Sequence, residues 1–100
     1  MGALLSLIIL SQIRIMHFTD LFYDTRVGVV EFHFDRVGNS LATGYHVAVC
    51  DEPNSCFDFS MRQRQGAWHI TKTKQLPVWI VDFESLLSDS IYNHLARTAP

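Results

Sequence analysis

Five histidines accompany only eight Lys and Arg residues in this chain of 100 residues. The ordinary pKa of histidine lies near neutrality, so this side chain serves as a general base, a metal ligand or a pH-sensitive charge. Protonation of all five would move the formal net charge from −2 to +3. Which of these roles is open depends on the acidic and hydroxyl side chains that the fold brings next to each histidine.

The elements that must position these histidines are strands. Alternation of apolar and polar residues predicts a four-stranded antiparallel meander over about residues 27–73. The apolar positions of each strand would face a core, and the polar positions would face solvent. Turn-forming residues indicate a tight turn at Gly38-Asn39 and longer turns at 51–55 and 63–66.

These turns predict a row of polar side chains across the outer face of the sheet. Glu31 is expected opposite His46, His46 opposite Ser60, and Ser60 opposite His69, with two further polar residues diagonal to the row. The candidate ligand-binding residues on this face are Glu31, His33, His46, Asp58, Ser60 and His69.

The predicted row has a functional and a plain structural interpretation. Glu31, His46 and His69 form a set of side chains that a divalent metal accepts, and His46 with Glu31 resembles an oriented general base. Ser60 beside a histidine resembles a nucleophile beside its base. However, solvent-facing strand positions are ordinarily polar, and a flat face lacks the concave pocket that catalysis needs. We therefore assign no catalytic residue, and expect no cofactor apart from this candidate metal.

The two cysteines, Cys50 and Cys56, are expected directly opposite each other on neighbouring strands. Opposed antiparallel residues are close enough for a disulfide, so a hairpin cross-link or a redox-responsive pair is one possibility. The sequence contains no recognisable export signal, which favours a cytoplasmic protein with reduced thiols.

Helical periodicity follows the strands. Pro77 suits the first turn of a helix over about residues 77–96, and its apolar stripe consists of Ile80, Phe83, Leu87 and Ile91. Residues 3–24 are apolar and lack Gly and Pro, so they are expected to form helices on the apolar face of the sheet, although a strand is an alternative for part of them. The expected fold is a two-layer α+β sandwich in a single domain, residues 1–100.

The N-terminal segment carries no clear targeting signal. Its apolar run, residues 3–10, is shorter than the ~20 residues that span a bilayer. Residues 1–15 are a candidate for a peripheral or non-native extension, with Met16 as an alternative start. His17 lies in an apolar stretch and is expected to pack rather than to bind a ligand.

The composition of the chain also limits the classes of partner that it can bind. A net charge of −2 lacks the basic field that nucleic-acid binding requires, and the cations between Asp58 and Asp82 are interpreted as solvated strand ends. An open sheet exposes its edges, so a homodimer is expected. The sequence thus predicts a non-catalytic interaction or accessory protein that acts as a homo-oligomer. The alternative is a domain that uses the polar row to bind a metal or a small ligand, with or without hydrolysis of that ligand.

Overall fold

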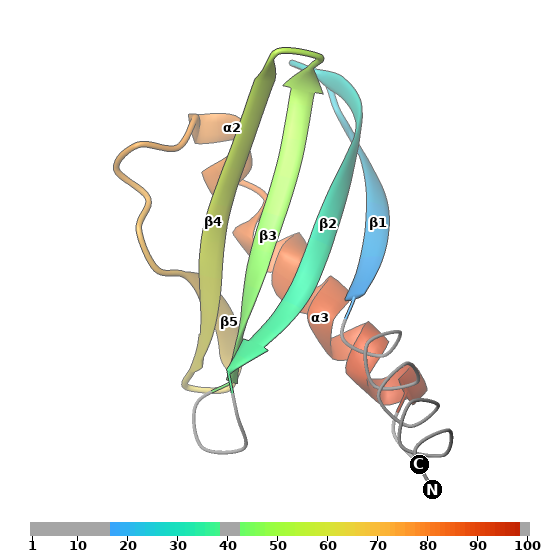
Figure 1. The fold of residues 1–100 in the computed structure, drawn as a ribbon, viewed down its shortest axis with the longest axis vertical. Helices are drawn as coiled ribbons and strands as arrows, with labels where there is room; N and C mark the ends of the chain where they lie inside the picture. Colours follow the sequence, from blue (N-terminus) through green and yellow to red (C-terminus); the bar gives the residue numbers. More distant parts are fainter. Residues whose placement is uncertain (1–16, 39–42, 99–100) are drawn as a thin grey trace, which may run out of the picture.

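The computed structural model describes residues 17–38 and 43–98 (Figure 1). Five strands follow one another along the chain: β1 (His17–Asp24), β2 (Gly28–Gly38), β3 (Thr43–Glu52), β4 (Ser55–Arg64) and β5 (Ala67–Ile70). They pair antiparallel in the order β1-β2-β3-β4-β5. Two helices follow, α2 (Val78–Val81) and α3 (Glu84–Thr98). The expectations for residues 1–15 and for Asn39 lie outside the described residues.

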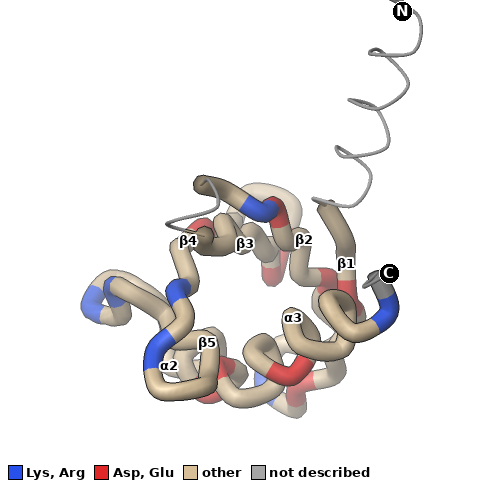
Figure 2. The backbone as a smooth tube through the Cα atoms, turned by 90° about the horizontal axis from the view of Figure 1, so that it is seen from below, with Lys and Arg blue, Asp and Glu red and all other residues tan. Residues whose placement is uncertain are grey.

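The sheet curls around α3, which crosses its concave side (Figures 1 and 2). The α+β class is confirmed, but the architecture is a five-stranded half-barrel rather than a four-stranded sandwich. The additional strand is β1, in a segment where we expected helix. Its burial alternates along the strand, and Phe18 and Phe22 pack against the core. Because the segment is mostly apolar, its alternation of inward and outward residues was not recognised in the sequence. Pairing with β2 supplies the backbone hydrogen bonds of the strand.

The predicted apolar stripe of the C-terminal helical region is confirmed. All four of its side chains are buried: Ile80, Phe83, Leu87 and Ile91. The single helix expected over 77–96 is instead two helices, with a turn in which the Phe83 N–H donates to the Ile80 carbonyl at 2.9 Å. Burial raises the pKa of the Tyr45 phenol, so this ring stays neutral within the core.

Polar side chains of α3 cover the outer edge of β5. The Trp68 N–H donates to the Ser88 hydroxyl at 3.0 Å, and the Ile70 N–H donates to a Glu84 carboxylate oxygen at 2.9 Å. An edge strand that exposes free N–H groups can pair with another chain. These two side chains satisfy the donors of β5, so this edge of the sheet is protected.

Two connections differ in length from those expected. Gly38 pairs with Thr43, so residues 39–42 join β2 to β3 in place of a tight turn at Gly38-Asn39. Gln65 and Gly66 both have positive φ, +53° and +82°, which gives a two-residue hairpin turn between β4 and β5. In the β2–β3 hairpin, the partner of each residue lies four positions from the expected one. In the β4–β5 hairpin, it lies two positions from the expected one. Both shifts are even, so every side chain keeps its predicted face.

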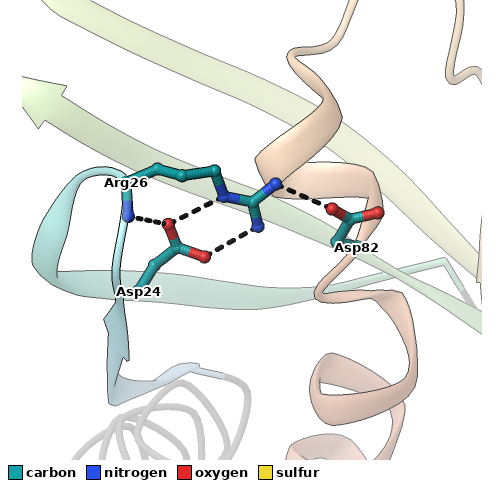
Figure 3. A network of polar contacts seen from close by, with 3 residues as sticks. All are labelled: Asp24, Arg26 and Asp82. Atoms are coloured by element: carbon teal, nitrogen blue, oxygen red, sulfur yellow. Dashed lines mark hydrogen bonds and ion pairs between the residues drawn. The ribbon is translucent and has the colours of Figure 1, made fainter.

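One arginine ties the β1–β2 turn to the helices (Figure 3). The Arg26 guanidinium donates twice to the carboxylate of Asp24, at 3.0 and 2.8 Å, and once to Asp82, at 2.8 Å. The Arg26 backbone N–H also donates to Asp24 at 2.8 Å. These hydrogen bonds hold the pKa of Asp24 below its usual value, although burial opposes the shift.

We expect Arg26→Gln to lower the stability of the protein at neutral pH and to flatten its acid dependence. Because the pKa of Asp24 is lowered on folding, its contribution is complete above pH 3.8, the ordinary value, and is lost as the pH falls through the folded pKa. Urea unfolding between pH 7 and pH 2 measures this dependence. Arg64→Gln removes an exposed arginine and is the control. Equal pH profiles for the wild type and Arg26→Gln would contradict the role of this contact.

Candidate functional site

The observed register breaks the predicted polar row. His46 does lie opposite Ser60, as expected, but its partner on β2 is Asp35 and not Glu31. His69 lies opposite Arg62 and not Ser60. The lengths of the two connections described above account for both corrections.

Three of the candidate histidines each contact one carboxylate on or beside this outer face. His33 Nε2 lies 3.0 Å from Glu31 Oε1, and His46 Nε2 lies 3.3 Å from Asp58 Oδ2. His69 Nδ1 lies 3.5 Å from Glu84 Oε1, so its partner comes from α3 and not from the sheet. Each carboxylate therefore faces a single imidazole.

His17 is a fourth member of this pattern that the sequence interpretation missed. Its Nδ1 lies 2.7 Å from Asp35 Oδ1, and both side chains are about half exposed. We expected His17 to pack in an apolar segment, which was wrong because residues 17–24 form a strand whose odd-numbered residues face outward. The signal that could have found it is the alternation of Phe18 and Phe22 with polar neighbours.

The one-to-one pairing does not assemble a metal centre. Glu31, His46 and His69 lie on three different strands and are not brought together by the observed register. In the part of the chain that the structure describes, no three His, Cys, Asp or Glu side chains converge as metal ligands. The observed register therefore does not form the cross-strand row from which the sequence predicted a metal site.

Cys50 and Cys56 lie opposite each other, as the sequence predicts, and form a disulfide. Reduced thiols were our default expectation, so this is a difference from it. The opposition depends on an irregularity of β3 between Cys50 and Glu52, because Glu52 pairs with Ser55 across a two-residue turn. If the ladder continued regularly from the Glu52–Ser55 pair, Asp51 and not Cys50 would lie opposite Cys56, and the two cysteines would point to opposite faces.

A strip of exposed apolar side chains occupies the outer face of β1 and β2. Leu21, Tyr23 and Val29 are 62%, 71% and 69% exposed, and Tyr23 lies directly opposite Val29. Solvent-facing positions of a strand usually carry polar residues, so these three neighbouring apolar side chains are a candidate contact surface.

A cleft of about 750 Å³ lies beside β4, where the chain leaves the sheet. The Thr71 N–H still donates to the Ser60 carbonyl at 3.0 Å, and the segment that follows bends away before α2 (Figure 1). The polar residues that line the cleft include His46, Asp58, Ser60, Thr71, Lys72 and Lys74. Three of them are candidates from the sequence, whereas Glu31, His33 and His69 do not line it. The two lysines were missed because their stretch was interpreted as solvated strand ends.

Fold and site together define a small α+β half-barrel that carries an exposed apolar strip and a polar cleft at opposite ends of its sheet. Comparison with known protein families, curated proteins and solved structures finds no match to this chain. Among the described residues, no helix has the length and apolar character needed to cross a membrane.

We expect removal of the disulfide to lower the free energy of unfolding by about 2 kcal/mol, because the cross-link joins cysteines only six positions apart and so closes a short loop. Urea unfolding of Cys50→Ala/Cys56→Ala measures the difference. The wild type in excess reductant should match the double variant.

Alkylation without reductant, followed by intact-mass measurement, tests the bond directly. An unmodified mass is the expected result for the folded and the unfolded chain. Two modified thiols per chain would show that the cysteines are reduced and would remove the basis of the stability prediction.

Proposed function

We propose that this protein is a non-catalytic interaction module that acts as a homodimer, with β1 of two copies side by side. The observation that carries the proposal is the exposed strip of Leu21, Tyr23 and Val29, which lies on the outermost two strands of the sheet. Burying a side chain such as leucine against a partner contributes about 1.5–3 kcal/mol, and a two-fold axis doubles every contact.

The two edges of the sheet differ in a way that supports this choice of strand. The edge at β5 is covered by Glu84 and Ser88 of α3. The sequence of β1, HFTDLFYD, contains none of the lysines or prolines that commonly protect an edge strand. β1 is also eight residues long, enough for a second copy to extend the sheet.

The side-chain pattern of β1 selects one register for such a pairing. A two-fold antiparallel pair keeps both faces continuous only when the axis passes through a residue and not between two residues. An axis at Asp20 would set two inward-facing carboxylates opposite each other, which is unfavourable. An axis at Leu21 sets the two leucines opposite each other and brings Tyr23 of each copy beside them. The exposed strips of both copies then become continuous.

A cytoplasmic location stays a prediction, and the disulfide argues against it. Cytoplasmic thiols are kept reduced, so a cross-link such as Cys50–Cys56 is more typical of an oxidising compartment. Nucleic acid remains an unexpected partner because Trp68 and Phe59, the aromatic residues within or next to the basic stretch in the sequence, are buried and unavailable for stacking on bases.

The cleft beside β4 favours a second candidate function, the binding of a small ligand. It is lined by His46, Asp58 and Ser60 from the predicted polar row. Its volume falls within the ~300–1,000 Å³ of typical small-molecule sites. The cleft and the β1 edge belong to opposite ends of the sheet, so ligand binding and dimerisation are compatible.

We expect the full chain to sediment at micromolar concentration as a species of twice the 11.5 kDa chain mass. Leu21→Lys/Tyr23→Lys should weaken the dimer on the order of a hundredfold or more, because it places four ammonium groups at the axis and removes the apolar contact. Sedimentation velocity over a concentration series measures the change.

Val78→Lys is the matched control, since Val78 is 70% exposed but lies in α2, away from β1. This variant should remain dimeric. A wild-type chain that sediments only at 11.5 kDa, or a dimer that Leu21→Lys/Tyr23→Lys leaves intact, would contradict the proposal.

A further inference from the structure

Half of the eight basic residues of the chain lie in one stretch of sequence, and two of them line the cleft. Between Asp58 and Asp82 the sequence has four cations, Arg62, Arg64, Lys72 and Lys74, and no acidic residue. Figure 2 shows blue segments on the β4–β5 side and in the loop before α2, with others beside β2 and near the C-terminus, and red segments along α3 and β1 and beside β4. The fold therefore places a positive field on the side of the molecule where the cleft opens.

The cleft gathers these charges together with neutral hydrogen-bond donors. Lys72 and Lys74 line it, as do the hydroxyl groups of Ser60, Thr71 and Thr73. A smaller hollow of about 280 Å³, lined by Arg62 and Arg64, shares Thr71 with the cleft. Two ammonium groups and several hydroxyl groups around one concavity match the many acceptor oxygens of a phosphate group.

The acidic group of the cleft does not cancel this field. The Asp58 carboxylate lies 3.3 Å from His46 Nε2, so it already has a polar partner on the sheet. The lining thus has two lysines against one carboxylate, which leaves a net positive charge. The lining of the cleft also includes the partly buried Leu76, against which the carbon skeleton of a ligand can pack.

We infer that this cleft binds a phosphorylated small molecule, with its phosphate group between Lys72 and Lys74 and its organic part against Leu76. The cleft volume of about 750 Å³ far exceeds a free phosphate ion and suits a metabolite with a monoester phosphate. This inference rests on the small-ligand function above and is independent of the dimer.

Backbone amide NMR of the full chain tests the inference with glucose 6-phosphate and glucose as probes, at constant ionic strength. Glucose 6-phosphate should shift the amides of residues 58–60 and 71–76 in a saturable manner, and glucose should not. Lys72→Gln/Lys74→Gln should weaken the binding on the order of tenfold or more, because two charge-assisted hydrogen bonds are lost.

Arg36→Gln/Arg97→Gln is the matched control, since it removes the same charge from residues that do not line the cleft. Its affinity should equal that of the wild type. Equal binding of glucose and glucose 6-phosphate would overturn phosphate recognition while leaving a ligand-binding cleft. An absence of shifts with either probe would overturn both. If both double variants lost affinity equally, the loss would come from the change in net charge and not from contacts in the cleft. This result would also overturn the inference.

Discussion

Packing of α3 into the concave side of the sheet is the interaction on which the rest of this structure depends. Leu87 and Ile91 are fully buried there. Polar groups of the same helix reach both ends of the sheet: Glu84 and Ser88 accept hydrogen bonds from β5, and the Ser90 hydroxyl donates to Asp20 of β1 at 2.7 Å. One helix that is anchored to the first and last strands holds the sheet in its curl, because a flat sheet could not satisfy both sets of contacts.

The curl leaves a single convex face with two different ends. Because β5 is short, the chain leaves β4 at Thr71, and the departing segment forms the cleft with its two lysines. At the other end, β1 has no described neighbour on its outer side, and Leu21 and Tyr23 remain exposed. Between these ends, histidines and carboxylates pair one to one. This pairing explains why so many histidines can share a face without forming a metal centre.

Much of the fold could be predicted, and the errors have a common origin in connection lengths. The alternation in β2 to β5 and the apolar stripe of the C-terminal helical region follow from local periodicity, and both are confirmed. Cross-strand partners depend on the exact length of each connection. The Cys50–Cys56 opposition was predicted correctly because the extra residue in β3 compensates for the short turn that follows it. The Glu31–His46 pairing had no such compensation and was wrong.

The sequence by itself therefore determined which side chains face the core and which face solvent, because a strand has a period of two and even shifts of register preserve it. It also determined the cation-rich stretch and the pair of cysteines. Only the tertiary structure decided that β1 is a strand, which carboxylate each histidine meets, and that Lys72 and Lys74 border a cleft with His46. These outcomes depend on contacts between residues far apart along the chain, whose free energies no local pattern contains.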